Sequence, residues 1–139
     1  MARMRSGFAV IGDVQFLPGY SVLLTDDETA DHLTDLDWDR RRDFLFDMSL
    51  LGEAIRNACH GHGLVRINYE VLGNSLNVVH AHVFPRYSWE GAEMLRGPVW
   101  RYPTEQLYGA EHEYDDARHG EVRRAIEAEL ARLMDAAYR

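Results

Sequence analysis

Two histidines separated by a single residue, His80 and His82, are the side chains in this sequence best suited to chemistry. Alternate side chains of an extended strand point to the same face, so these imidazoles would lie side by side, about 7 Å apart along the strand. A neutral imidazole nitrogen is a good nucleophile at neutral pH, and a histidine adduct splits one difficult transfer into two easier steps. The pair therefore indicates phosphoryl or nucleotidyl transfer, in which one histidine attacks and the other binds a phosphate oxygen.

A short turn just before the histidines supplies hydrogen-bond donors. Gly73, Asn74 and Ser75 offer backbone N–H groups, an amide and a hydroxyl, all of which can donate to phosphate oxygens. From the residues alone, two other interpretations remain open: a strand with two inert, half-exposed histidines, or a zinc site completed by a distant carboxylate. The donors of the turn fit a phosphate better than a metal ion.

The strand that must hold the histidines is expected over residues 78–84, because this stretch is rich in β-forming residues and Pro85 is expected to end it. A preceding strand is expected over 64–71, so the two are predicted to form a hairpin. The face opposite the histidines would pack against the core, because its residues are all apolar: Val79, Ala81 and Val83.

Changes of hydrophobic period along the chain predict the remaining elements. They are strands over 7–11 and 20–24, a helix over 38–58, an ordered loop over 88–103 and a terminal helix over about 116–139. This order predicts an α+β fold, an antiparallel β-sheet with covering helices, in a single domain over residues 1–139. The open edge of such a sheet can be protected by a covering helix or by dimerisation.

The charge of the chain argues against several classes of partner. Fifteen basic and 23 acidic residues give a formal net charge of −8, whereas general binders of nucleic acid or of anionic membranes need a cationic face. Cys59 is the only cysteine, and no apolar run is long enough for a signal peptide or a membrane span. We expect a cytoplasmic protein that binds phosphate only through local donors.

Other polar and aromatic side chains have simpler explanations. Arg86 is expected to cap the strand or form an ion pair, or else to contact phosphate. The remaining histidines beside Cys59 or in the acidic stretch before the terminal helix are expected in a solvated turn or on a charged surface: His60, His62, His112 and His119. The aromatic residues of the loop either stack on a nucleobase or are buried under the loop: Trp89, Trp100 and Tyr102.

The segment HAHVFPR at 80–86, following NYEVLGNS at 68–75, resembles the histidine triad superfamily of nucleotide hydrolases and transferases. The signature of that superfamily is His-x-His-x-His followed by two apolar residues, and in the branch related to diadenosine polyphosphate hydrolases the strand continues into Pro-Arg-Tyr. Further segments look like the same branch: DVQFLPGYSVLL at 13–24, HLTDLD at 32–37 and GPVWRYP at 97–103. The resemblance covers residues 8–103 and implies the same antiparallel α+β fold.

The resemblance also implies a role for each matching residue. His80, as the middle histidine, would attack the α-phosphorus and form a nucleotidyl-histidine intermediate, while His82 would contact the phosphate or assist the leaving group. The resemblance implies no metal and no cofactor. It does imply a homodimer. The substrate would be held by polar side chains: Asp13 on the ribose hydroxyls, Asn68 near the reacting phosphate and ribose, and Ser75 on the phosphate, beside Asn74 of the same turn.

Two positions depart from the pattern of the family. Val78 stands where the first histidine of the triad is expected, and Tyr20 stands where many relatives carry a histidine. The first histidine supports the phosphate site by hydrogen bonding, so its loss would cost about 1–3 kcal/mol, or up to about 100-fold in rate. The implied function is hydrolysis at the α-phosphate of a dinucleoside polyphosphate or a nucleoside phosphate conjugate. The alternatives are a nucleotide-binding protein with weak or no turnover, and a nucleotidyl transferase or phosphorylase.

Overall fold

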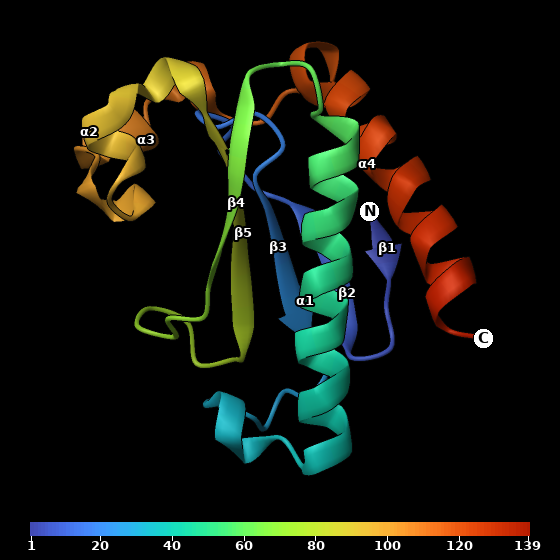
Figure 1. Ribbon diagram of the computed structural model, residues 1–139. Coiled ribbons are helices and arrows are strands. Elements are labelled where there is room, and N and C mark those ends of the chain that lie inside the picture. Colours follow the sequence, from blue (N-terminus) through green and yellow to red (C-terminus); the bar gives the residue numbers. More distant parts are fainter.

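A computed structural model describes residues 1–139 and contains one antiparallel sheet of five strands (Figure 1). The strands are β1 (Ala2–Arg3), β2 (Gly7–Ile11), β3 (Ser21–Thr25), β4 (Leu64–Glu70) and β5 (His80–Tyr87). Their order across the sheet is β1-β2-β3-β5-β4, so the hairpin of β4 and β5 joins the sheet through β5 and leaves β4 at one edge. The predicted α+β fold with an antiparallel sheet and covering helices is confirmed.

Two long helices cover one face of this sheet, α1 (Trp38–Ala58) and α4 (Asp116–Ala137). Helix α1 packs against β3, β4 and β5, and α4 packs against α1 and β1. Helix α1 begins after Asp37, whose carboxylate accepts a hydrogen bond from the Arg40 N–H. The predicted helix over 38–58 is confirmed, and the terminal helix ends two residues before the end of the chain. Neither helix is long and apolar enough to cross a lipid bilayer, and the same holds for every other helix.

The main core lies between the sheet and these two helices. Val79, Ala81 and Val83 belong to it, as the alternation of the strand predicts, so His80 and His82, which lie between them, point to the opposite face. The side chains that the sheet and the helices contribute include Leu23, Ala81, Val83, Phe44, Leu51, Ile55, Ile126 and Leu130.

The chain between β5 and α4 folds into short helices, whereas an ordered loop was expected over 88–103. They are η2 (Ser88–Glu90), α2 (Gly91–Leu95), η3 (Val99–Arg101), α3 (Thr104–Leu107) and η4 (Ala110–His112); a similar turn, η1 (Leu33–Asp35), precedes α1. Helices of this length are too short to show a hydrophobic period in the sequence. A second, smaller core joins this segment to β5, and it consists of Leu17, Phe84, Tyr87, Val99, Tyr102 and Leu107.

The strand that carries the histidines differs from its expected range at both ends. It begins at His80, two residues later than expected, and it continues through Pro85 to Tyr87. Strand β3 pairs only with residues 80–83, so the second half of β5 has β4 as its single neighbour. A proline is tolerated on the unpaired side of a strand, because no ladder hydrogen bond is lost there. The expectation that Pro85 ends the strand is therefore wrong.

The other strands lie close to their expected ranges. The strand over 7–11 is confirmed, the one expected over 20–24 lies one residue later, and the one expected over 64–71 ends one residue earlier. The short strand β1, which pairs with β2, was not predicted from the sequence.

Candidate functional site

Strand β5 holds His80 and His82 on one face of the sheet, as predicted. Their ring centroids are 4.9 Å apart, and the rings stand at 80° to each other. On β3, Leu24 lies opposite His80 and Val22 lies opposite His82, while Glu70 of β4 lies opposite His82 on the other side. Residues that pair across antiparallel strands share a face, so the histidines have apolar neighbours towards β3 and a polar neighbour towards β4.

A backbone carbonyl fixes the ring of His80. The Nδ1 atom of His80 lies 2.7 Å from the carbonyl oxygen of Val78, and the residue is only 6% exposed. A carbonyl oxygen can only accept a hydrogen bond, so Nδ1 carries the hydrogen, and in the neutral ring Nε2 keeps its lone pair. His80 is thus held in the tautomer that an attacking imidazole needs.

Val78 stands at the position where the resemblance expects a further histidine. It lies just outside β5 and is half-buried. Its side chain cannot donate a hydrogen bond, but its carbonyl oxygen holds the His80 ring. The contact that sets the tautomer of His80 therefore does not depend on the side chain at position 78.

A tyrosine hydroxyl holds the second histidine. The Tyr20 hydroxyl oxygen lies 2.7 Å from Nδ1 of His82, and the two atoms share one hydrogen. Burial lowers the pKa of His82 to about 4, and the neighbouring His80 adds a smaller effect in the same direction. Burial likewise raises the pKa of Tyr20 far above its usual range, with smaller contributions from Tyr108 and then Asp13. Both groups are therefore neutral at neutral pH.

Aromatic rings enclose His82. The ring of Phe84 lies nearly parallel to it with the centroids 5.8 Å apart, and Trp100 meets it edge to face at 5.3 Å. Tyr20 stacks on Phe84 with the centroids 4.3 Å apart. The indole Nε1 of Trp100 donates a hydrogen bond to the Glu70 carboxylate, which ties η3 to β4 beside His82. These rings shield part of His82 from water, and this burial is the main cause of its lowered pKa.

The four residues expected to hold a substrate lie in three parts of the chain. Asp13 is exposed in the connection between β2 and β3, close enough to Tyr20 to affect its pKa. Asn68 lies on β4 opposite Phe84, and therefore on the face of the histidines. Asn74 and Ser75 are exposed in the loop between β4 and β5, directly before the histidine strand.

A buried ion pair lies behind the aromatic rings. Nε of Arg86 donates to both carboxylate oxygens of Glu90, at 3.1 and 2.9 Å, and Nη2 contacts Glu90 Oε2 at 2.8 Å. The remaining donors of the guanidinium bind Asn68 Oδ1 and the carbonyl oxygens of Gly97 and Met94. The ion-pair interpretation of Arg86 is confirmed, and its guanidinium has no donor left for a phosphate.

Sequence reasoning assigned no role to Glu70 or Glu90 and did not find the contact between Tyr20 and His82. The spacing of Arg86 and Glu90 signals an ion pair only where both residues lie on one helix, and Arg86 lies on a strand. The other contacts depend on how β3 and β4 align with β5, and that register is set by the whole sheet.

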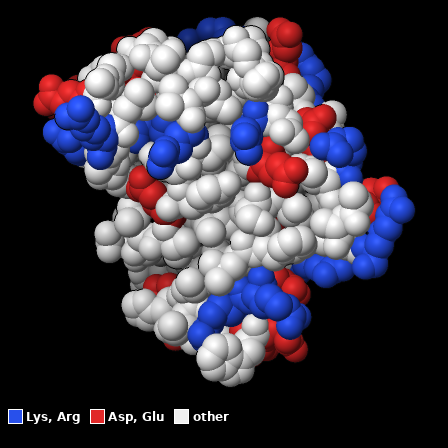
Figure 2. Space-filling view, viewed as in Figure 1, with Lys and Arg blue, Asp and Glu red and all other residues white.

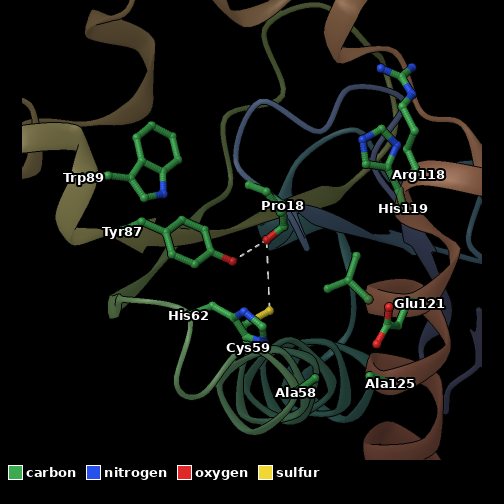
Figure 3. Close-up of a pocket in the computed structure, with 11 residues that line it drawn as sticks. Pro18, Ala58, Cys59, His62, Tyr87, Trp89, Arg118, His119, Glu121 and Ala125 are labelled. Carbon is green, nitrogen blue, oxygen red and sulfur yellow. Dashed lines mark hydrogen bonds between the residues drawn. The ribbon is translucent and has the colours of Figure 1, made fainter.

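A separate cavity of about 390 Å³ lies where the end of α1, the start of α4 and the end of β5 meet (Figure 3). Cys59 is buried beside it, and the Tyr87 hydroxyl donates to the Pro18 carbonyl oxygen. His62 and His119 also line it, and Nδ1 of His119 accepts a hydrogen bond from the Asp115 N–H. No three histidine, cysteine or acidic side chains of the chain are placed to hold a metal ion together.

The sequence matches no protein-family model and no curated protein. Solved structures share its fold. A histidine triad protein from Marinobacter aquaeolei VT8 superposes with a TM-score of 0.74, covering 94% of this chain and 87% of that one at 21% sequence identity. A histidine triad protein from Bradyrhizobium japonicum gives a TM-score of 0.73, with 93% and 87% of the two chains covered and 14% identity.

A third structure, a histidine triad protein from Sinorhizobium meliloti 1021, gives a TM-score of 0.70, covering 91% of this chain and 88% of that one at 19% identity. These three likenesses extend over nearly the whole chain. The protein therefore has the fold of histidine triad proteins.

Proposed function

We propose that the protein is a nucleotide hydrolase that cleaves a dinucleoside polyphosphate, or a related nucleoside phosphate conjugate, at the α-phosphorus. The observation that carries this proposal is the tautomer of His80, whose Nε2 lone pair is free because Nδ1 donates to the carbonyl of Val78. In a neutral imidazole the nitrogen without a hydrogen is itself a nucleophile and needs neither a general base nor a metal ion to form its adduct.

The reaction takes two steps. In the first, the Nε2 lone pair of His80 forms a bond to the α-phosphorus, and the bond from phosphorus to the bridging oxygen breaks, so the leaving phosphate departs with that electron pair. In the second, water attacks the same phosphorus, the N–P bond breaks, its electron pair returns to Nε2, and the proton of the water passes to solvent. A nucleoside monophosphate is released.

His82 stabilises charge in both steps. In this mechanism the neutral Tyr20 hydroxyl donates to Nδ1 of His82, so the hydrogen of the His82 ring resides on Nε2. That N–H donates to a phosphate oxygen or to the departing oxygen. The rings around His82 shield part of it from water, and a hydrogen bond made in such a partly buried site is electrostatically stronger than one in water.

The surface next to the histidines suits a nucleoside. Val22 and Leu24 on β3, with Phe8 on β2, share the histidine face and are partly or largely exposed. Such an apolar surface can bury one face of a base. The resemblance assigns the contacts with ribose and phosphate to Asp13, Asn68, Asn74 and Ser75, and each of these side chains is at least partly exposed.

The variant His80→Asn tests the proposal. The native protein should release adenosine monophosphate from a diadenosine polyphosphate and from adenosine phosphoramidate, and His80→Asn should reduce both rates to background, because an amide cannot form the adduct. The variant His62→Asn changes an exposed histidine outside the site and is the matched control. Equal rates for the native protein and His80→Asn would remove the proposal.

A second candidate, a nucleotide-binding protein with little turnover, is favoured by one observation, the valine at position 78. Under this hypothesis calorimetry finds nucleotide binding by the native protein while no product accumulates. The variant Val78→His should then raise turnover by up to about 100-fold, because it restores one hydrogen-bonding partner in the phosphate site. If the native protein already hydrolyses the substrate and Val78→His slows it, the site is adapted to valine and the second candidate is wrong.

A further inference from the structure

A groove of about 720 Å³ lies between strand β4 and the segment that contains α2. Arg66, Asn68 and Glu70 of β4 line one side of it, and Arg96 and Gly97, which follow α2, line the other. Figure 2 shows positive side chains over the junction of α2 with the upper half of β4. With two arginines and one glutamate in its lining, the groove has a net positive charge on a chain whose formal net charge is −8.

The two arginines of the groove are free to bind an anion. Of the 15 arginines in the chain, only three have a side chain that forms neither an ion pair nor a hydrogen bond: Arg56, Arg66 and Arg96. The chain has 23 acidic residues, and these pair with most of the other arginines. Two of the three unpaired guanidiniums thus border one groove, and guanidinium groups bind phosphates through several parallel N–H donors.

Asn68 adds oriented donors to the same groove. Its Oδ1 accepts a hydrogen bond from Nη1 of Arg86 at 2.7 Å. An arginine can only donate, so this contact settles which end of the amide is the oxygen, and Nδ2 points away from Arg86. The buried pair of Arg86 and Glu90 holds this arrangement, while Nδ2 of Asn68 donates to no other group of the chain. Asn68 therefore presents two N–H donors to the groove.

The groove starts beside the histidines. Glu70, at its near end, lies opposite His82, and Asn68 and Arg66 follow on the same face at steps of two residues, each about 7 Å. The carboxylate of Glu70 accepts a hydrogen bond from Nε1 of Trp100, which holds this side chain against η3. A phosphate chain that passes His82 can therefore continue along β4 towards Arg66.

We propose that this groove binds the phosphate chain of the leaving group, beyond the phosphorus that His80 attacks. The inference rests on the proposed function, and it names the part of the substrate that β4 and α2 recognise. Arg66 and Arg96 contact the distal phosphates, and Asn68 contacts a phosphate nearer to His82. The groove would strengthen the binding of substrates that have several phosphates beyond the scissile bond. It would not affect the binding of a phosphoramidate, which has none.

Calorimetry with inorganic tripolyphosphate tests the groove without any turnover. The native protein should bind tripolyphosphate, and the double variant Arg66→Gln/Arg96→Gln should bind it about tenfold more weakly, as expected for the loss of two exposed charge contacts. The variant Arg56→Gln removes the third unpaired arginine, which lies on α1 outside the groove, and should bind as the native protein does. Failure of the native protein to bind, or equal weakening by Arg56→Gln, would overturn the proposal.

Steady-state kinetics separates this proposal from the proposed function. The double variant should raise KM for diadenosine tetraphosphate and leave the kinetics of adenosine phosphoramidate unchanged. If His80→Asn abolishes turnover but the double variant handles both substrates as the native protein does, the groove proposal fails and the hydrolase proposal stands. If neither substrate is cleaved and tripolyphosphate affinity falls only in the double variant, the hydrolase proposal fails and anion binding by the groove stands.

Discussion

At the scale of single residues, the two histidines of β5 are held in different ways. A backbone oxygen sets the tautomer of His80, so that tautomer persists whatever side chain stands at position 78. Side chains hold His82, through the Tyr20 hydroxyl and the rings of Phe84 and Trp100. Substitutions of these side chains should therefore change the surroundings of His82 and leave the hydrogen bond from His80 Nδ1 to the Val78 carbonyl oxygen in place.

The burial of His82 predicts a pH dependence of stability. Its pKa is about 4 in the folded protein, whereas an unperturbed histidine titrates at about 6.5. Between these values the unfolded chain binds a proton that the folded protein does not, so the free energy of unfolding falls as the pH is lowered from about 6.5 towards 4. Urea unfolding across this range measures the effect, and NMR titration of the His82 ring measures its pKa directly.

Two variants isolate the contribution of His82. His82→Gln should weaken the dependence of stability on pH in this range, because it removes the histidine whose pKa burial lowers to about 4, while His119, whose pKa burial also lowers, remains. His60→Gln changes an exposed histidine in the turn after α1 and should leave the dependence as it is. A His82 ring that titrates near pH 6.5, or the same slope in both variants, would contradict the effect of burial described for this residue.

At the scale of elements, the ion pair of Arg86 and Glu90 joins β5 to the short helices that follow it. Both side chains are almost completely buried. Glu90 also accepts hydrogen bonds from the Tyr87 N–H and the Tyr102 hydroxyl. The Glu90 carboxylate therefore joins β5, η2 and the residue that follows η3. The same contacts position Asn68, through Arg86, and the segment that carries Trp100.

The variant Glu90→Gln should lower the free energy of unfolding by about 3 kcal/mol or more, because it leaves the buried Arg86 charge without its counter-charge. Urea unfolding monitored by circular dichroism measures the change. Glu93→Gln is the matched control, since the Glu93 side chain is 88% exposed and lies 4.0 Å from Arg101; it should leave stability nearly unchanged. Similar losses in the two variants would mean that the buried pair contributes no more than a surface contact.

Elements with a clear local signal could be predicted from the sequence. The range of α1 follows from an Asp37 cap, a regular apolar period and the glycines after Cys59. The alternation of β5 placed His80 and His82 on one face and Val79, Ala81 and Val83 in the core. These features are encoded within a few residues of where they occur.

Features that depend on distant parts of the chain could not be predicted. The extension of β5 beyond Pro85 is possible because β3 stops pairing at residue 83, which no local pattern reveals. The partners of Tyr20, Asn68 and Glu70 likewise follow from strand register.

The roles expected for Asp13, Asn74 and Ser75 stay predictions, and so does the homodimer that the resemblance implies. Sedimentation would show the dimer at twice the chain mass of 16.0 kDa.

At the scale of the whole molecule, β5 is shared by both cores. Ala81 and Val83 belong to the larger core between the sheet and the long helices, while Phe84 and Tyr87 belong to the smaller core under the short helices. Neither core can come apart without losing side chains of this strand. The two cores should therefore unfold as a single cooperative unit.

Native-state hydrogen exchange would detect this coupling. The amides of Ala81 and Val83 should exchange only through global unfolding, with the same opening free energy as amides at the centre of α1, and those of the exposed loop around Asn74 should exchange far sooner. Faster, subglobal exchange in β5 would show instead that the cores open separately. Under this expectation, fluctuations of the exposed loops leave the position of the His80 ring unchanged, because the strand that bears it opens only when the whole protein unfolds.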